Sequence, residues 1–378
     1  MTNVVIAGYA RSPFHLAGKG DLARVRPDDL AAQTIRGLLE KTGVDAADIE
    51  DIILGCAFPE GEQGLNVARM IGLLADLPLA VGGMTVNRFC GSSMSAIHIA
   101  VGQINIGAGE AFICAGLESM SRVPMGGYNP LPNPELFKKN KGAYMGMGET
   151  AENVARNYQI TRTEQDAFAV KSQDKAAAAR AEGRLTDEIV TIQTKAGPVD
   201  QDGTIRAGTT AEALAGLKPA FSSDGTVTAG TSSPLTDGAS AVLVTSEDFA
   251  NKHGLTILAR IKSVAVSGND PETMGLGPIY ASKKALERAG ITVADLDVVE
   301  INEAFASQAI ACIRDLGLKP ETINLDGGAI AIGHPLGATG ARIVGKAAAL
   351  LSREGGRYAL ATQCIGGGQG IATVLERA

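Results

Sequence analysis

Tryptophan is absent from this chain, aromatic residues make up only 4%, and no long run of basic residues occurs. With a formal net charge of −7, the composition does not favour nucleic acid as a partner. No apolar stretch approaches the roughly 18 residues that a membrane-spanning helix requires, so membrane insertion is not expected. Residues 4–7 read as a first strand so close to the start that no signal peptide is expected, and we expect a cytoplasmic protein.

Histidine and cysteine are also scarce. The chain has four histidines and five cysteines, with no Cys-x-x-Cys or His-x-x-x-His pair, so a structural metal site is not expected. The cysteines are too scattered for a disulfide framework. They are Cys56, Cys90, Cys114, Cys312 and Cys364.

Length and composition describe a globular protein with more than one packed unit. Hydrophobic residues make up 45% of the 378 residues and charged residues 20%, and such a length exceeds one ordinary core. Residues 39–53 resemble residues 286–299, with Gly43 aligned to Gly290. Each copy reads as an amphipathic helix ending at the glycine, then a short loop and an apolar strand. This repeat predicts two similar α/β halves.

A segment of different composition separates the halves. Residues 120–230 contain several prolines and an Ala-, Lys- and Glu-rich helical stretch at 164–182. Insertions of this kind on a rigid scaffold commonly carry substrate-binding loops. We expect an N-terminal half at residues 1–119, completed by about 231–265, an inserted loop domain at 120–230 and a C-terminal half at 266–378.

Cys90 lies in the segment Asn-Arg-Phe-Cys-Gly-Ser-Ser, between an expected strand end at 84–87 and an expected helix at 92–106. The N-terminus of that helix points N–H groups and a positive dipole end at the sulfur, which favours a thiolate nucleophile. A buried, inert cysteine is the alternative. The glycine and serines leave room for an acyl group, which favours the reactive interpretation.

His334 occupies a similar corner in the second half. It lies in a glycine-rich run after an expected strand at 323–325 and before an expected helix at 339–351. The repeat places Cys90 and His334 at comparable strand-to-helix corners, which a pseudo-two-fold arrangement brings to one cleft. His334 is then suited to accept the Cys90 proton, and a loop histidine packed beside Pro335 is the alternative.

Two further candidates stand beside apolar strands. Cys364 precedes Ile365 and three glycines, whose amides can form an anion-binding concavity. A tight turn between strands at 358–362 and 371–375 explains the glycines but not the second thiol. Asn302 follows the strand of the second repeat, where it is either a helix cap or the anchor of a catalytic water or oxyanion.

Four segments, in order along essentially the whole chain, closely resemble those of thiolases. They are Asn-Arg-Phe-Cys-Gly-Ser-Ser at 87–93, Asn-Glu-Ala-Phe-Ala at 302–306, Gly-Gly-Ala-Ile-Ala-Ile-Gly-His-Pro-Leu-Gly at 327–337 and Cys-Ile-Gly-Gly-Gly-Gln-Gly at 364–370. The resemblance implies an α/β fold of two similar five-stranded halves. These form a duplicated five-layer α-β-α-β-α architecture with a loop domain inserted in the first half.

The resemblance also implies a role for each candidate. Cys90 carries the acyl group, His334 activates it, and Cys364 removes or returns the proton on the acetyl carbon. Asn302, through a water, and His334 stabilise one thioester oxyanion, and the amides of Cys90 and Gly366 stabilise the other. The implied reaction is a reversible, ping-pong cleavage of 3-ketoacyl-CoA by CoA into acetyl-CoA and a shortened acyl-CoA.

Coenzyme A is thus implied as a co-substrate, with no permanently bound cofactor. Residues 145–152 lack the histidine that many biosynthetic thiolases place before Met-Gly, and residues 228–233 look more like the degradative members. This favours a degradative 3-ketoacyl-CoA thiolase over a biosynthetic acetoacetyl-CoA thiolase, and an idle CoA- or lipid-binding subunit is the alternative from another class. The family implies a homodimer or homotetramer and allows a hydratase/dehydrogenase partner subunit. The residues that match positions near CoA are Arg206, Ser233, Ala304 and Phe305.

Overall fold

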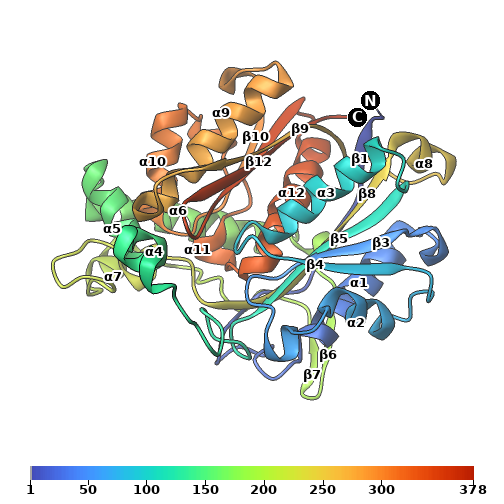
Figure 1. The fold of residues 1–378 in the computed structure, drawn as a ribbon. Coiled ribbons are helices and arrows are strands. Elements are labelled where there is room, and N and C mark those ends of the chain that lie inside the picture. The colour runs from blue at the N-terminus through green and yellow to red at the C-terminus, as the bar shows by residue number, and fades with distance from the viewer. Residues whose placement is uncertain (1) are drawn as a thin grey trace.

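A computed structural model describes residues 2–378 of the protein. Its centre is a ten-stranded sheet in the order β10-β11-β12-β9-β1-β8-β5-β3-β4, with the short β2 paired to β8 (Figure 1). The strands of this sheet are β1 (Val4–Arg11), β2 (His15–Leu16), β3 (Asp51–Gly55), β4 (Gly82–Val86), β5 (Ala111–Ser119), β8 (Thr236–Ser246), β9 (Ala259–Gly268), β10 (Val298–Ile301), β11 (Tyr358–Ile365) and β12 (Gln369–Glu376).

The sheet consists of two halves with the same strand pattern. In the first, β1 and β5 flank β8 as antiparallel partners, and β5, β3 and β4 are parallel. In the second, β9 and β11 flank β12 in the same way, and β11 and β10 are parallel. The halves meet at β1 and β9, which share only the pairs Val5–Arg260 and Ile6–Ala259. The strand expected at 323–325 is reduced to a single bridge between Ile323 and Val299.

Helices cover both outer faces and fill the space between the halves. α1 (Pro27–Thr42) and α2 (Val67–Leu74) pack on the first half, and α9 (Gly277–Ala289) packs on the second, with α10 (Ala306–Leu316) beside it. α3 (Ser92–Asn105) and α12 (Leu336–Glu354) lie between the halves and contact each other (Figure 1). One apolar core lies between the outer helices and the first half of the sheet, one lies between the outer helices and the second half, and a third surrounds α3 and α12 and includes residues of both halves. This confirms the five-layer α-β-α-β-α architecture.

The internal repeat corresponds to matching structure in the two halves. α1 ends at Gly43 with φ 68°, and α9 ends at Gly290 with φ 69°, a left-handed conformation that glycine adopts without strain. A single 3₁₀ turn follows each glycine, η1 (Ala46–Asp48) and η7 (Val293–Asp295), and leads into β3 and β10 respectively. The predicted order of helix, glycine, loop and strand is therefore confirmed in both copies.

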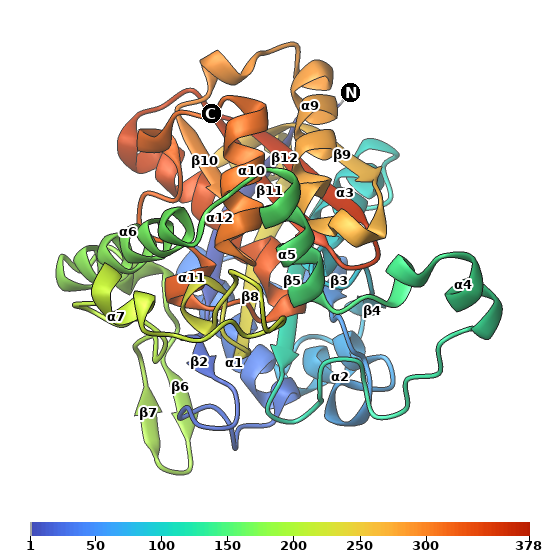
Figure 2. The same ribbon diagram turned by 90° about the vertical axis from the view of Figure 1, so that its left-hand side faces the viewer.

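The residues between β5 and β8 leave the layered core. Their longest helix, α6 (Arg162–Ala181), agrees with the helix expected at 164–182 and begins with a capping box between Thr161 and Glu164. Figure 2 shows α4 on one side of the molecule and α7 with the β6–β7 hairpin on the other. The other elements of the excursion are α4 (Pro134–Lys139), η3 (Lys141–Tyr144), α5 (Met147–Asn157), η4 (Thr186–Glu188), β6 (Ile192–Thr194), β7 (Gly197–Val199), α7 (Ala211–Ala215) and η5 (Ala229–Thr231).

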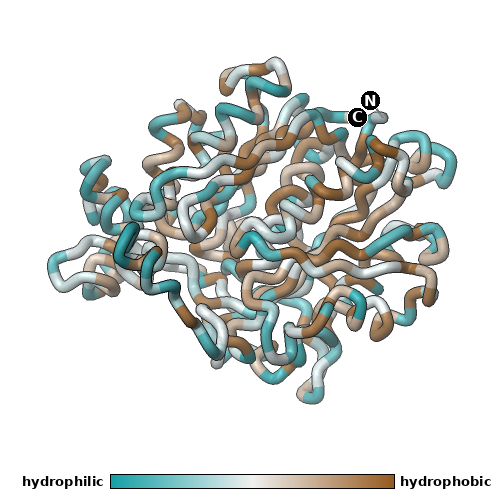
Figure 3. Tube along the Cα trace, viewed as in Figure 1, coloured by the Kyte–Doolittle hydropathy of each residue, from teal (hydrophilic) through white to brown (hydrophobic). Residues whose placement is uncertain are grey.

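Apolar residues follow the layers. Figure 3 shows the most apolar stretches along the central strands, with hydrophilic residues on the outer helices and loops. Across residues 2–378, we find no helix with the length and apolarity needed to span a membrane.

The boundary expected near residue 265, between the completed N-terminal half and the C-terminal half, falls inside β9. The remaining elements are η2 (Gly61–Gln63), α8 (Glu247–Lys252), η6 (Pro271–Leu276), η8 (Pro320–Thr322) and α11 (Ala329–Ile332).

The contact between α3 and α12 predicts a pair of opposite stability effects. A Cβ at Gly340 would lie 2.3 Å from the Met94 nitrogen, so Gly340→Val should destabilise the fold by about 1–3 kcal/mol. A Cβ at Gly102, an exposed position of α3, would meet nothing within 4 Å, so Gly102→Ala should stabilise it by about 0.5–1 kcal/mol. Urea unfolding of both variants measures the difference. Equal stability of the Gly340→Val variant and the unmodified protein would contradict the close helix contact.

Candidate active site

The N-termini of α3 and α12 meet at Gly116 of β5. A Cβ at Gly116 would lie 2.2 Å from the Gly337 oxygen and 2.7 Å from the Ser93 Cβ, so only glycine permits both helices to approach. The Ser93 hydroxyl also accepts the N–H of Ala341 at 2.9 Å. Cys90 stands just before α3 and His334 just before α12. The structure thus brings the two corners together, as the repeat predicted.

The turn that carries Cys90 is held in an unusual conformation. Phe89, the residue before it, has φ +43°, which is uncommon for a residue other than glycine. The Ser92 hydroxyl accepts the N–H of Arg88 at 2.9 Å and donates to the Phe89 carbonyl at 2.6 Å. These bonds stabilise a tight connection from β4 to α3 and fix the direction of the Cys90 side chain.

Cys90 is a neutral thiol at rest. Although part of the residue is exposed, burial of the thiol raises its pKa to about 11, against the opposing effect of the Gly366 and Cys90 backbone N–H groups. The buried Glu118 carboxylate adds to the increase. At Cys90 the desolvation penalty therefore exceeds the stabilisation that the backbone N–H groups give to a thiolate, contrary to the expectation that the helix start favours the thiolate form.

His334 has a defined tautomer. Its Nδ1 lies 2.6 Å from the Thr339 hydroxyl oxygen, and that hydroxyl donates to the Pro335 carbonyl at 3.1 Å. The hydroxyl proton is thereby engaged, so Nδ1 must be the donor and Nε2 carries the free lone pair. Nε2 lies 3.3 Å from the Asn302 amide nitrogen. Burial, with a smaller effect of Arg342, lowers the pKa of His334 to about 3, so the ring is neutral at rest.

Asn302 is not a helix cap. It follows β10, its N–H donates to the Thr362 carbonyl at 3.0 Å, and the next helix, α10, has Phe305 at its N-cap position. Its amide nitrogen faces His334. Its Oδ1 is buried and has no hydrogen-bond partner within residues 2–378. A buried polar atom of this kind is suited to hold a water beside the imidazole.

Cys364 lies on β11 against the Cys90 turn. The neighbouring Gln363 amide donates to the Cys90 carbonyl, and a Cβ at Gly91 would lie 2.4 Å from Ile365. Cys364 is only 1% exposed, and burial, followed by the effect of Cys90, raises its pKa well above the ordinary value. The structure therefore places two neutral thiols side by side. The glycine that follows, Gly366, directs its N–H at the Cys90 sulfur.

Three of the four residues matched to CoA positions come together. The Ser233 N–H donates to the Ala304 carbonyl at 3.0 Å, and Phe305 shares an apolar cluster with Ala304 and Cys364. Arg206 lies apart on an exposed loop, where its N–H donates to Gln173 of α6 at 2.8 Å. Contacts therefore run without a break from Cys364 through Phe305 and Ala304 to Ser233. Within residues 2–378, Arg206 forms no hydrogen bond or ion pair with these four residues.

Sequence reasoning missed two buried carboxylates that fix the catalytic loops. Glu303 accepts hydrogen bonds from Asn324 at 2.8 Å and from the Ile330 N–H at 3.2 Å. Glu118 accepts from the N–H groups of Ala57 at 2.8 Å and Gly337 at 2.9 Å. Burial raises the pKa of both groups. An acid inside an otherwise apolar strand at 111–119 was the available signal for Glu118.

Comparison with known proteins decides the family. The thiolase N-terminal domain model matches residues 4–248, and the thiolase C-terminal domain model matches residues 255–377. The chain belongs to the thiolase family. It is 47% identical to a 3-ketoacyl-CoA thiolase of Bacillus subtilis (strain 168) and 49% identical to one of Shewanella frigidimarina (strain NCIMB 400), with 100% of each chain covered in both cases.

A solved structure agrees with this membership. The crystal structure of human mitochondrial 3-ketoacyl-CoA thiolase in complex with CoA matches with a TM-score of 0.92 and 37% sequence identity. The match covers 100% of this chain and 98% of the human chain. The layered fold, the excursion and both strand-to-helix corners are therefore features that this thiolase shares with a protein of known structure.

The electrostatics of the site predict how Cys90 reacts with iodoacetamide. With a thiol pKa of about 11, the thiolate fraction, and with it the alkylation rate, should rise about tenfold per pH unit between pH 6 and 9. His334, with a pKa of about 3, stays neutral over this range. Mass spectrometry of the Cys90 peptide gives the rate, and a Cys364→Ala variant should show the same profile. A rate that is constant from pH 6 to 8 would demonstrate a resting thiolate instead.

Proposed function

We propose that this thiolase cleaves 3-ketoacyl-CoA with CoA, giving acetyl-CoA and an acyl-CoA shortened at the carboxyl end, as in fatty acid β-oxidation. The observation that carries the proposal is the pair of neighbouring thiols, Cys90 and Cys364, together with the neutral imidazole of His334, whose helix N-terminus meets that of the Cys90 helix at Gly116. One thiol serves as nucleophile and the other as acid, which carbon–carbon cleavage requires. The relatives named 3-ketoacyl-CoA thiolase, each aligned over the whole chain, support the same substrate class.

In the first half-reaction, the Cys90 sulfur attacks the 3-keto carbon as His334 Nε2 takes the thiol proton. At rest this transfer is uphill, because burial disfavours both the thiolate and the imidazolium, so it accompanies attack on the substrate. The bond between C2 and C3 then breaks, and its electrons pass to C2. The Cys364 thiol protonates C2, so acetyl-CoA leaves, the acyl group stays on Cys90, and a Cys364 thiolate faces a His334 imidazolium.

The second half-reaction restores every proton. The Cys364 thiolate takes the proton from the CoA thiol, and the CoA sulfur attacks the acyl thioester. The bond from the acyl carbon to Cys90 breaks, and His334 returns its proton to the departing sulfur. The enzyme is again neutral at all three groups. Because every group returns to its starting protonation state, the same steps in the opposite order carry out the condensation.

Two sets of donors are available for the oxyanions of these steps. The Gly366 and Cys90 N–H groups already point at the Cys90 sulfur, so they can stabilise a negative oxygen on one thioester carbon. His334, once protonated, and a water held by Asn302 serve the other carbonyl. Such preorganised donors act in a dry site, where they contribute most to the rate.

CoA binding is assigned to the excursion at residues 120–230 and to the loops that it touches. Ser233, Ala304 and Phe305 form the side of the apolar path to Cys364, and Phe221 of the excursion packs edge-on against Phe305 at 5.9 Å between ring centroids. We place the pantetheine and acyl portions along this path. The exposed guanidinium of Arg206 is suited to the nucleotide portion.

The degradative substrate is preferred over the alternatives. The full-length relatives carry the name 3-ketoacyl-CoA thiolase, so a biosynthetic acetoacetyl-CoA thiolase is not favoured. An idle CoA- or lipid-binding subunit would not need a second thiol beside Cys90. All five cysteines are free, as expected in a reducing compartment, and this supports the cytoplasm as the site of action. A profile of thiolysis against acyl chain length tests the substrate.

The division of labour predicts different losses for the two thiols. Cys364→Ala should still accept an acyl group from acyl-CoA on Cys90, but carbon–carbon cleavage and exchange of the acetyl-CoA α-proton should fall by about 10²–10⁴-fold. Cys90→Ala should lose both half-reactions, because no acyl intermediate can form. Acyl labelling by mass spectrometry and deuterium incorporation into acetyl-CoA are the measurements.

Cys114→Ala is the matched control, since Cys114 is a buried cysteine of β5 outside the site and its loss should change neither reaction. Rapid α-proton exchange in Cys364→Ala would show that another base does this work. An acyl label on Cys364 during turnover of the unmodified enzyme would contradict the assignment of Cys90.

The exposed edge of the sheet at β4 supports the proposal that the protein forms a homodimer or homotetramer. β4 ends the sheet, and its five residues are only half-buried in one chain. Around it, Leu65 is 89% exposed, Leu79 is 79% exposed and Ile106 is 81% exposed. An open sheet edge flanked by large apolar side chains is unfavourable in water and is commonly covered by another subunit. A hydratase/dehydrogenase partner subunit stays a prediction from the family.

This edge predicts the mass of the protein in solution. At micromolar concentration, light scattering should give two or four times the 38.8 kDa of one chain. Leu79→Asp together with Ile106→Asp should shift the mass downward, because two charges would have to be buried without partners. Lys252→Glu, on exposed α8, is a control that should leave the mass unchanged. A monomer mass for the unmodified protein would contradict assembly through β4.

A further inference from the structure

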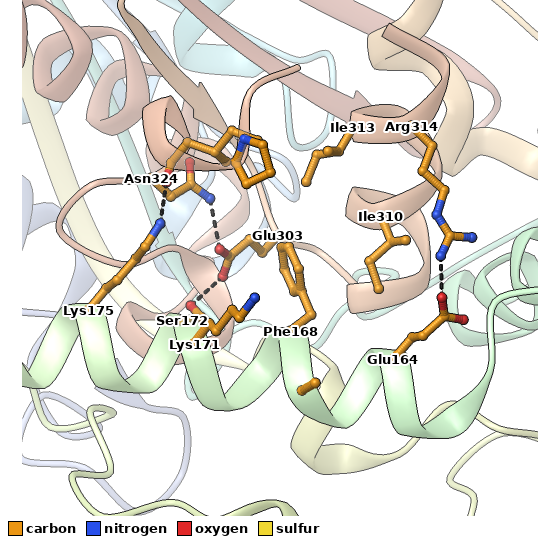
Figure 4. A pocket seen from close by; sticks show the side chains of 13 residues that line it. Glu164, Phe168, Lys171, Ser172, Lys175, Glu303, Ile310, Ile313, Arg314 and Asn324 are labelled. Carbon is orange, nitrogen blue, oxygen red and sulfur yellow. Dashed lines mark hydrogen bonds and ion pairs between the residues drawn. The ribbon is translucent and has the colours of Figure 1, made fainter. Parts of the chain in front are cut away.

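A pocket apart from the candidate active site lies between α6 and α10. Its volume is about 410 Å³, within the roughly 300–1,000 Å³ typical of small-molecule sites. Cys90, His334 and Cys364 are not among its lining residues, so it is not the space in which the proposed reaction occurs. Figure 4 shows α6 on one side and α10 on the other, with side chains from both helices directed toward the space between them.

The wall of this pocket is mostly hydrocarbon. Phe168 projects from α6, and Ile310 and Ile313 project from α10 (Figure 4). Ile323 also lines the pocket. Phe168 and Ile310 also pack on the buried Ile330 cluster, which keeps them in place from behind. An alkyl chain placed among these side chains would lose its contact with water, which is favourable in proportion to the apolar area covered.

Buried hydrogen bonds fix the inner wall. The Glu303 carboxylate accepts from the Ser172 hydroxyl at 2.6 Å and from the Asn324 amide at 2.8 Å. The Lys175 ammonium donates to the Ile323 carbonyl at 2.6 Å. These bonds tie α6 to residues on both sides of α10 in the sequence, so the pocket exists without a ligand. A preformed cavity binds with little loss of conformational freedom.

The charges of the pocket leave one cation available. Arg314 is paired with Glu164 across the rim, Lys175 is committed to the Ile323 carbonyl, and both oxygens of Glu303 are engaged. The Lys171 side chain is exposed, and its ammonium forms no hydrogen bond or ion pair with any of residues 2–378. Its positive charge lowers the pKa of Lys175, whose pKa burial has already lowered, so an anion beside Lys171 would relieve repulsion between the two.

We propose that this pocket binds a small amphipathic carboxylate, with an alkyl chain among Phe168, Ile310 and Ile313 and the carboxylate at Lys171. The single free ammonium selects an anion over a cation, and the hydrocarbon wall selects an alkyl chain over a free inorganic anion. The proposal concerns a site outside the catalytic groups and does not depend on which acyl-CoA the enzyme cleaves.

Decanoate binding to the full-length protein tests the proposal by isothermal titration calorimetry. We expect one saturable site per chain in the unmodified protein. Ile313→Trp should abolish this site, because the larger side chain fills the space between α6 and α10. Lys171→Glu should weaken binding by about tenfold or more, because the carboxylate then meets a like charge. Decyltrimethylammonium, with the same chain and the opposite charge, should not occupy the site.

The matched control is Lys252→Glu, which reverses an exposed lysine on α8 and should bind decanoate as the unmodified protein does. Circular dichroism and thermal unfolding of each variant establish that it is folded. The proposal fails if the unmodified protein shows no saturable binding. It also fails if folded Ile313→Trp and Lys171→Glu retain the original affinity, which would place decanoate elsewhere, for example along the path to Cys364.

Discussion

The close approach of α3 and α12 is the constraint on which the rest of the structure depends. Glycines at 116, 337 and 340 leave no side chain between the two helices, or between these helices and strands β3 and β5. Both helix N-termini can therefore reach one point, and the residues just before them, Cys90 and His334, face a common space. Any larger side chain at Gly116 would move Cys90 away from His334 before it affected either group directly.

The same packing determines the charges of the site. Because the central layer is enclosed by both halves of the sheet, desolvation outweighs the backbone N–H groups at Cys90 and raises its pKa, and desolvation lowers the pKa of His334, so both groups stay neutral. A neutral thiol is protected from indiscriminate reaction with electrophiles in water. In the proposed mechanism, Cys90 becomes reactive only when a substrate carbonyl can receive the electrons of its sulfur, and the Gly366 N–H is already in place as a donor. Burial thus contributes selectivity as well as stability.

Much of this could be predicted from the sequence, because local signals were strong. The repeat around Gly43 and Gly290 predicted the duplication, and the segments at Cys90 and His334 predicted two corners that the structure brings together. The neutral state of Cys90 could not be predicted, since the residues that bury it, such as Ile365, are distant in sequence. The Thr339 hydroxyl that sets the His334 tautomer gave no signal either, because a threonine inside a helix usually has no such role.

Strand pairing shows that the two halves carry different side chains at equivalent positions next to the candidate site. Asp51 pairs with Phe112 in the first half as Val298 pairs with Ala359 in the second, so Gly55 corresponds in position to Asn302 and Leu117 to Cys364. At Gly55 a Cβ would lie 2.2 Å from the Ser93 nitrogen, so the start of α3 occupies the space that the Asn302 side chain fills in the other copy. In the first half, Gly55 and Leu117 at the strand ends therefore serve only packing beneath the Cys90 turn. In the second half, the equivalent positions carry the Asn302 amide and the Cys364 thiol. The symmetry of the two halves brings the N-termini of α3 and α12 to one point. The differences between the halves provide the chemically distinct groups that thiolysis requires.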